Sequence, residues 1–239
     1  MTYVDGFLLA VPVANKDTYQ KRAAQAAPVF RELGARRFVE AWGDDIPEGA
    51  VTDFRLAVKA NTDEAVVFTW IEYASKEARD AAKLRILAEP RLKELGVSFP
   101  FDMQRMIYGG FAPLVEDGTP EGLGYVGGYL VAAPNSKKDA YRELAANRAK
   151  IFRDHGATRL VEAWADDVPD GRVTDYRSAV RAKADESVVF AWVEWASKEA
   201  RQAGMKKAFQ DPRMVRPDDA QLFDGRRMII GGFTPLIDV

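Results

Sequence analysis

The stretch RRFVEAWGDDIPEGAVTDFR, residues 36–55, returns almost unchanged as TRLVEAWADDVPDGRVTDYR, residues 158–177. The repetition extends well beyond it, because residues 3–115 align with residues 125–237 at a constant offset of 122 and without a gap. Roughly half of the paired positions are identical. Solenoids and propellers repeat every 20–50 residues, whereas a unit of about 113 residues has the size of a whole domain. We therefore expect two similar domains.

The domain boundaries follow from the segment between the two repeats. EDGTPEGLG, residues 116–124, is short and acidic and contains Gly and Pro, which is typical of a linker between ordered units. We place the first domain at residues 1–115 and the second at residues 125–239.

Composition and charge narrow the class of protein. The chain is 47% hydrophobic and 29% charged, as expected of a globular protein. The net charge of −2, with both signs well mixed, argues against a nucleic-acid partner, which usually requires a basic face. No apolar run approaches a membrane span, and the N-terminal MTYVDGFLLAVP is predicted to be a strand and not a signal peptide. We therefore expect neither nucleic acid nor a membrane as a partner.

The chain has no cysteine and one histidine. Disulfides, thiolate catalysis and cysteine-based or histidine-rich metal centres are therefore excluded. A reducing cytoplasm fits this composition, and we expect a cytoplasmic protein. The histidine, His155, corresponds to Leu33 of the first repeat, so a site common to both repeats does without it. We predict neither a bound metal nor a bound cofactor.

Each repeat alternates strands and helices. A helix is predicted over residues 17–33, and a second one begins at Ser75 and ends before Pro90. The strands are predicted from aromatic and β-branched residues over residues 3–11, 36–42, 66–73 and 105–114. The order β-α-β-β-α-β is the ferredoxin-like split motif of an α+β protein, with both helices on one face of an antiparallel sheet.

Residues 52–60 fit either a strand or a helix, because Phe54, Leu56 and Val58 alternate while Phe54, Ala57 and Val58 have helical spacing. An extra strand would reverse the chain before residues 66–73 and disrupt the pairing of neighbouring strands. We therefore favour a short helix or an irregular arm.

Strand periodicity divides the side chains of each strand into two faces. Val39 and Ala41 share one face of their strand, and Phe38, Glu40 and Trp42 share the other. In the next strand, the two faces carry Val67, Thr69 and Ile71 on one side and Val66, Phe68, Trp70 and Glu72 on the other. We assign the small aliphatic faces to the helices and the aromatic, acidic faces to the opposite side of the sheet.

A large exposed aromatic face is unusual on a soluble monomer. We expect the same face of the second repeat to cover it, by face-to-face packing or in a shared barrel. The enclosed side chains would then be Glu40, Trp42, Trp70 and Glu72 with Glu162, Trp164, Trp192 and Glu194.

Several motifs together resemble a known family. VDGFLLAVP, VEAWGDDIP, VVFTWIEYASKEAR, DPRM and GGFTP are similar to the YbaA-like family of uncharacterised bacterial proteins, which is related to the dimeric α+β barrel superfamily. The first repeat departs mildly from these motifs. EPRL, beginning at Glu89, replaces DPRM, and FDMQ, beginning at Phe101, replaces FDGR. Because members are typically single copies expected to dimerise, the resemblance implies a fused dimer forming one pseudo-dimeric α+β barrel. It implies no function, since cofactor-free monooxygenases, haem-handling proteins, lactone isomerases and stress-response proteins all share the wider fold.

The repeated carboxylates and aromatic residues are the candidate site. A carboxyl beside tryptophans in a poorly hydrated pocket has a raised pKa and can act as a general acid or base. The candidate catalytic residues are Glu40, Glu72, Glu162 and Glu194. The candidate ligand-binding residues are Trp42, Trp70, Trp164, Trp192, Phe68 and Phe190. The alternative is that Glu40 and Glu72 pair with arginines and only organise the sheet. The available partners are Arg37, Arg55 and Arg105, which recur as Arg159, Arg177 and Arg227.

Two further repeated features have simpler explanations. Asp44 and Asp45 could bind a hard cation, but they precede a proline, where Asp is a common turn residue. Gly109 and Gly110 lie in an apolar strand and lack the setting of a phosphate loop, so a bulge or a close backbone approach is favoured.

The sequence names no reaction and leaves two functions open. The first is a cofactor-independent enzyme or binding protein for a small, partly aromatic molecule, which would be the expected partner. The second is a structural or stress-associated protein with a filled interior and no catalytic activity.

Overall fold

The computed structural model describes residues 2–96, 100–214 and 221–239. The first repeat contains β1 (Tyr3–Pro12), α1 (Lys16–Glu32), β2 (Arg37–Asp45), α2 (Phe54–Ala57), β3 (Glu64–Tyr73), α3 (Lys76–Ala88), α4 (Pro90–Gly96) and β4 (Ile107–Gly118). The second contains β5 (Tyr125–Pro134), α5 (Lys138–Asp154), β6 (Ala157–Asp167), α6 (Tyr176–Ala179), β7 (Glu186–Trp195), α7 (Lys198–Gln210) and β8 (Ile229–Asp238). The predicted order of strands and long helices is confirmed.

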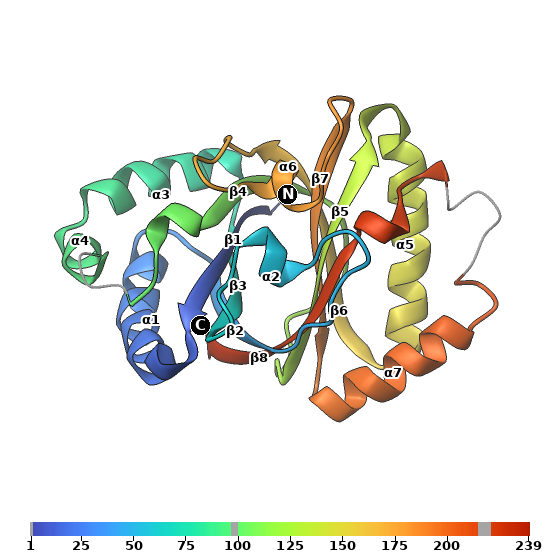
Figure 1. Ribbon diagram of the computed structural model, residues 1–239, viewed down its shortest axis with the longest axis horizontal. Coiled ribbons are helices and arrows are strands. Elements are labelled where there is room, and N and C mark those ends of the chain that lie inside the picture. The colour runs from blue at the N-terminus through green and yellow to red at the C-terminus, as the bar shows by residue number, and fades with distance from the viewer. Residues whose placement is uncertain (1, 97–99, 215–220) are drawn as a thin grey trace.

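The eight strands form one closed barrel shared by both repeats. Within each repeat the strands are ordered β4-β1-β3-β2 or β8-β5-β7-β6, and all neighbours are antiparallel. The last strand of each repeat then pairs with the second strand of the other, β4 with β6 and β8 with β2. The long helices lie outside the barrel on opposite sides, α1, α3 and α4 on one side and α5 and α7 on the other (Figure 1). The predicted pseudo-dimeric α+β barrel is thus confirmed.

Aromatic rings fill the centre of the barrel. Phe68 and Phe190 stack with their ring centroids 4.6 Å apart, and Trp70 and Trp192 stack at 4.8 Å. All four side chains are fully buried. Each repeat therefore covers the aromatic face of β3 or β7 with the corresponding face of the other repeat, as expected.

The face assignment of β2 was wrong. Val39 and Ala41 face the barrel interior, where they belong to the same buried cluster as Phe68. Trp42 instead packs beneath α1, in a cluster with Tyr19, and Glu40 lies in the same layer. Small side chains suit the inner face of β2 because the rings of β3 and β7 already occupy the barrel centre.

The segments left open by the sequence also have defined structures. Residues 54–57 form the short helix α2, and the side chain of Asp53 accepts a hydrogen bond from the backbone N–H of Leu56, which caps that helix. β4 continues to Gly118, so residues 116–118 of the expected linker pair with β6. At Gly110 the pairing with β6 shifts register, and a Cβ there would lie 2.5 Å from the Tyr3 hydroxyl, so a bulge and a close approach both occur.

Among the helices of the described ranges, none is both long enough and apolar enough to cross a membrane.

Candidate functional site

The predicted site residues separate into two places, and the first is an ion-pair cluster at one end of the barrel. The guanidinium of Arg159 holds Glu72 at two points, 2.7 Å each, and Arg37 holds Glu194 at 2.7 and 3.0 Å. A further contact of 3.2 Å joins Arg159 to Glu194. Each carboxylate is thus neutralised mainly by an arginine from the other repeat.

The indole N–H groups complete this ion-pair cluster. Trp70 donates to Glu72 and Trp192 donates to Glu194, each at 3.0 Å. Burial alone would raise the pKa of Glu72, but the hydrogen bonds and charge of Arg159 hold it below its usual value. Glu72 and Glu194 each make a two-point contact with an arginine, which is the arrangement that the arginine-pairing alternative expects.

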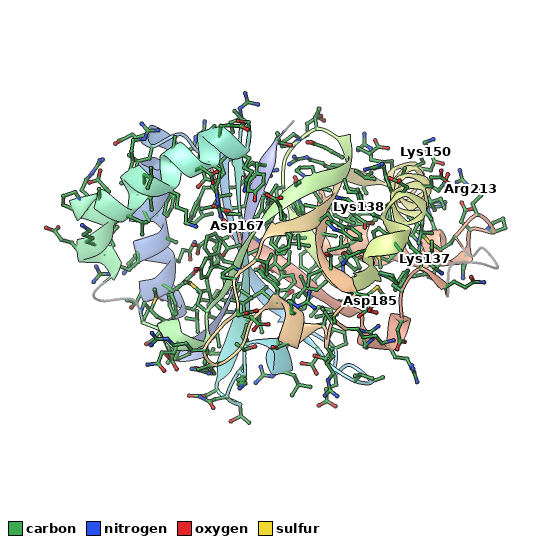
Figure 2. The ribbon with its side chains drawn as sticks, turned by 90° about the horizontal axis from the view of Figure 1, so that it is seen from above. Lys137, Lys138, Lys150, Asp167, Asp185 and Arg213 are labelled. Carbon is green, nitrogen blue, oxygen red and sulfur yellow. The ribbon has the colours of Figure 1, made fainter. Side chains whose placement is uncertain are left out.

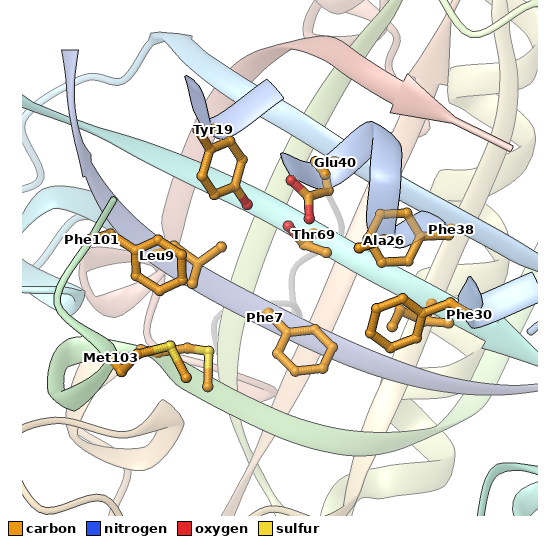
Figure 3. Close-up of a pocket in the computed structure, with 13 residues that line it drawn as sticks. Phe7, Leu9, Tyr19, Ala26, Phe30, Phe38, Glu40, Thr69, Phe101 and Met103 are labelled. Carbon is orange, nitrogen blue, oxygen red and sulfur yellow. The ribbon is translucent and has the colours of Figure 1, made fainter. Parts of the chain in front are cut away.

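The second place is a pocket between α1 and the outer face of the first repeat's sheet. We call it the first pocket; its cavity volume is about 150 Å³. Figure 3 shows Glu40 and Thr69 on the sheet, Tyr19 on α1, and Phe101 and Met103 on the segment before β4 converging on it. Its remaining lining is apolar: Phe7, Leu9, Ala23, Ala26, Phe30, Phe38, Ile71 and Met106.

Glu40 is the ionisable carboxyl of the first pocket. Burial raises its pKa to about 7, and a hydrogen bond from Tyr19 opposes part of that shift. Its Oε2 atom is buried and has no hydrogen-bond partner among the described residues. A buried carboxyl that titrates near neutral pH, with one oxygen unused, is suited to exchange a proton with a molecule in the cavity.

The second repeat has an equivalent pocket between α5 and its own sheet, which we call the second pocket. Its cavity volume is about 300 Å³. Tyr141 and Glu162 occupy the places of Tyr19 and Glu40, and the Tyr141 hydroxyl donates to Glu162 Oε2 at 2.7 Å. Burial raises the pKa of Glu162, whereas Tyr141 and the charge of Arg148 oppose the rise. The carboxyl–tyrosine pair is therefore present twice.

The predicted aromatic residues are divided between these places. Trp42 and Trp164 pack beside the tyrosines of the pockets, with the ring centroids of Trp164 and Tyr141 6.1 Å apart. The others, Trp70, Trp192, Phe68 and Phe190, form the barrel centre, and Trp192 also borders the second pocket. The expected enclosure of all four glutamates in one pocket is wrong, because β2 and β6 turn their carboxylates outward toward the helices.

Sequence reasoning missed the tyrosines of the pockets. Tyr19 and Tyr141 are identical at paired positions of the first helix, where about half of the aligned positions are identical. Each lies on the buried side of its helix. The available signal was a repeated tyrosine on the same helix face as a repeated alanine four residues later, Ala23 or Ala145.

The repeated aspartates join the two repeats. Asp167 contacts Arg79 of α3 at 2.6 Å and lies at the junction of the two halves (Figure 2). Asp45 makes the equivalent contact with Arg201 at 2.7 Å. Across residues 2–96, 100–214 and 221–239, no group of three or more histidines or carboxylates could hold a metal ion. The aspartates therefore act as ion-pair partners between the repeats.

The single histidine lies away from both pockets. His155 follows the last residue of α5, and its Nε2 atom is 3.0 Å from the Asp211 carboxylate. It borders neither pocket.

Comparison with known proteins finds the tandem pattern again. The family model described as a protein of unknown function, DUF1428, matches residues 2–103 and again residues 124–225. Uncharacterized protein YbaA of Escherichia coli K12 is 58% identical over 117 residues, which are 49% of this chain and the whole of that protein. The protein of the same name from Shigella flexneri matches equally.

Solved structures share the fold at low sequence identity. A candidate monooxygenase from Fusobacterium nucleatum has a TM-score of 0.63 at 7% identity and covers 99% of this chain and 93% of its own. A candidate monooxygenase from Lactobacillus acidophilus has a TM-score of 0.60 at 10% identity, covering 100% and 95%. An anthrone oxidase-like protein has a TM-score of 0.52 at 10% identity, covering 100% and 92%. These likenesses show the α+β barrel fold.

Proposed function

Because the chain belongs to the DUF1428 family, whose function is unknown, we propose a function from the two pockets themselves. Each repeat binds a small, largely aromatic molecule between its first helix and its sheet, and Glu40 or Glu162 exchanges a proton with that molecule. No bound cofactor takes part. The observation that carries the proposal is a buried carboxyl, paired with a tyrosine, at the wall of a mostly apolar cavity in both repeats.

The chemistry of the lining supports an aromatic ligand. Ligand pockets are mostly apolar and aromatic, with a few placed polar groups that fix orientation. Phe7, Phe30 and Phe101 supply ring surface in the first pocket, and Glu40 supplies the polar group. An apolar cavity of about 150 Å³ is large enough to hold benzene. A single-ring compound with one acidic O–H or C–H therefore fits the first pocket.

Proton transfer follows from the ionisation of Glu40. With a pKa of about 7, a substantial fraction of Glu40 is a carboxylate at neutral pH. The Glu40 carboxylate can accept the ligand proton, which leaves the ligand as an anion and Glu40 as the neutral acid; the reverse step returns the proton. The Tyr19 hydroxyl stabilises the carboxylate form, since its hydrogen bond lowers the carboxyl pKa.

The fold neighbours are compatible with a small-molecule ligand. Two of them are candidate monooxygenases and a third is named for its likeness to an anthrone oxidase. At 7–10% identity these likenesses show the shared fold and name no ligand or reaction for this chain.

Phenol tests the proposal, because it has one ring and stays neutral below about pH 10. A charge-assisted hydrogen bond from phenol to ionised Glu40 or Glu162 is stronger than one to the protonated acid. Phenol affinity should therefore rise severalfold between pH 5.5 and 8.5. In Glu40→Gln/Glu162→Gln the affinity should be independent of pH over that range.

Titration calorimetry at several pH values provides the measurement. The exposed Glu48 offers a matched control, and Glu48→Gln should retain the wild-type pH profile. Absence of saturable phenol binding, or an unchanged pH profile in the double variant, contradicts the proposal. It would favour the alternative of a structural protein with a filled interior.

A further inference from the structure

We propose that the second pocket binds a hydroxyaryl ketone, whose hydroxyl group contacts Glu162 and whose carbonyl oxygen accepts a hydrogen bond from Tyr129. This inference rests on the proposed function, since it names the class of ligand for one of the same two pockets. The observation behind it is that Tyr129 lines the second pocket at the place where Phe7 lines the first. At this position the second pocket therefore has a hydroxyl group and the first does not.

Strand register places Tyr129 and Glu162 on either side of one small residue. Tyr129 of β5 and Glu162 of β6 both pair with Ala191 of β7, and all three residues line the cavity. Because neighbouring strands lie about 4.8 Å apart, the backbones of Tyr129 and Glu162 are separated by about 10 Å, with the methyl group of Ala191 between them. The corresponding row of the first repeat is Phe7, Thr69 and Glu40 (Figure 3). A ring that lies above Ala191 can therefore meet a polar side chain on each side.

The Tyr129 hydroxyl is a donor that can change its partner. It donates to the Sδ atom of Met205 at 3.5 Å. A thioether sulfur is a weak acceptor, whereas an amide or ketone oxygen is a much stronger one. Burial raises the pKa of Tyr129 to about 12, so the hydroxyl keeps its proton throughout the neutral pH range. A ligand carbonyl oxygen at this wall of the cavity should therefore replace the sulfur.

Tyr129 also stabilises the charge that proton exchange produces. When the Glu162 carboxylate removes the hydroxyl proton of a para-hydroxyaryl ketone, Glu162 becomes the neutral acid and the ligand becomes an anion. Conjugation through the ring carries part of the negative charge to the carbonyl oxygen. A hydrogen-bond donor that is already in place where charge develops stabilises that anion. The reverse step returns the proton to the ligand, and no other reactant is consumed.

The volume of the second pocket suits two fused rings. The cavity is about 300 Å³, and about 150 Å³ is enough for benzene. 6-Hydroxy-1-tetralone carries a hydroxyl group para to its ketone on two fused rings. 5,6,7,8-Tetrahydro-2-naphthol has the same rings and the same hydroxyl group without the ketone. Comparison of the two compounds therefore isolates the contribution of the carbonyl oxygen.

Tyr129→Phe tests the inference, and Phe7 shows that the equivalent strand accepts phenylalanine at this position. The wild type should bind 6-hydroxy-1-tetralone about tenfold more tightly than tetrahydronaphthol, as expected for one buried hydrogen bond. Tyr129→Phe should lose most of this preference and bind tetrahydronaphthol within about threefold of the wild type. Titration at pH 7, followed through the ¹³C-labelled methyl groups of Met214 and Met228, measures each affinity at the second pocket, because both methionines line it.

Tyr108→Phe is the matched control. It removes a hydroxyl group from a tyrosine that is 41% exposed and borders neither pocket, so the preference for the ketone should stay at the wild-type value.

The carbonyl stretching band provides a second measurement, which needs no variant. A hydrogen bond to a ketone lowers its stretching frequency, so the bound 6-hydroxy-1-tetralone should absorb at a lower frequency than it does in an apolar solvent. If Tyr129→Phe does not fold, this band decides. Equal binding of the two compounds by the wild type, an unchanged preference in Tyr129→Phe, or a band at the apolar-solvent frequency overturns the inference and leaves the proposed function intact. Absence of binding of both compounds and of phenol overturns the proposed function and the inference together.

Discussion

Arg37 of the first repeat and Glu194 of the second form a buried ion pair with two contacts, 2.7 Å from Nη1 to Oε1 and 3.0 Å from Nη2 to Oε2. Arg159 and Glu72 form the reciprocal pair. Because each arginine and its principal carboxylate come from different repeats, the shortest contacts of these charges cross between the repeats. The two halves of the chain are therefore electrostatically dependent on each other as well as joined through the barrel.

Glu194→Gln should strongly destabilise the protein. Removal of the Glu194 charge leaves the buried Arg37 with two weaker partners. Asp238 lies at 2.8 Å but is more exposed, and Glu72 lies at 3.7 Å. Breaking one side of a buried pair typically costs about 3–5 kcal/mol of unfolding free energy. Urea unfolding at pH 7 measures the loss. The exposed Arg226 provides a control, since Arg226→Gln should have little effect. A loss below about 1 kcal/mol for Glu194→Gln would contradict a structural role.

Sequence periodicity predicted the fold because the fold class follows from the order of strands and helices alone. It could not decide which face of β2 points inward, since the helices cover the outer face of the barrel and both faces of β2 are buried. Val39 and Ala41 were assigned to the helices on the basis of size. The barrel centre accepts small residues there because Phe68 and Phe190 already fill it. Side-chain size therefore predicts the face only when the opposite wall is known.

The candidate site was predicted in its residues and not in its arrangement. Glu40 and Glu72 occupy equivalent places in the sequence pattern, each on a strand beside a tryptophan. The register of β2 against β3, which sets Glu40 opposite Thr69 and Arg37 opposite Glu72, separates them; Glu72 reaches Arg159, and Glu40 lies beneath α1. That separation depends on the register between two strands that are distant in sequence, for which local patterns carry no information.

Glu40→Gln should alter the pH dependence of stability. Burial raises the Glu40 pKa from 4.5 to about 7, so the folded protein binds this proton more tightly than the unfolded chain. The resulting stabilisation is complete below about pH 4.5 and is lost as pH rises through 7. It amounts to roughly 3 kcal/mol. The variant lacks this loss. Its unfolding free energy, relative to that of the wild type, should therefore increase as the pH rises from 5 to 8.5.

Chemical unfolding at several pH values tests this expectation. The curve for Glu48→Gln should run parallel to the wild-type curve, because Glu48 is exposed. A parallel curve for Glu40→Gln would show that Glu40 is ionised with an ordinary pKa.

Tyr141→Phe should raise the pKa of Glu162 further. The Tyr141 hydroxyl donates to Glu162 Oε2 at 2.7 Å and lowers the carboxyl pKa. Phenylalanine retains the ring contacts of Tyr141 with Trp164 and Phe223, each at 6.1 Å between centroids, but removes the donor. NMR titration of ¹³C-labelled glutamate carboxyl groups measures the shift. A lower Glu162 pKa in the variant would mean that the tyrosine does not stabilise the carboxylate.

Gly128→Ala should destabilise the barrel by overpacking its centre. A Cβ atom at Gly128 would lie 2.8 Å from the Phe233 ring and 3.0 Å from the Phe68 ring. Forcing an extra methyl group into a well-packed core typically costs about 1–3 kcal/mol. Gly225→Ala is the comparison, because its Cβ would have no neighbour closer than 4.0 Å. Equal urea midpoints for the two variants would show that the centre can relax.

Gly225→Met should close part of the second pocket and leave the fold intact. The first repeat carries Met103 at the equivalent place, in a short helix of the same kind, so the backbone accepts a methionine. The methionine should occupy cavity volume that a two-ring compound needs, because Gly225 lines the second pocket. We expect 2-naphthol affinity to fall at least tenfold while phenol affinity and the melting temperature stay near wild-type values. Calorimetric titrations with both compounds measure this difference in size selection. Unchanged 2-naphthol binding would place the ligand elsewhere, because a side chain of this size at the cavity wall cannot leave a two-ring ligand undisturbed.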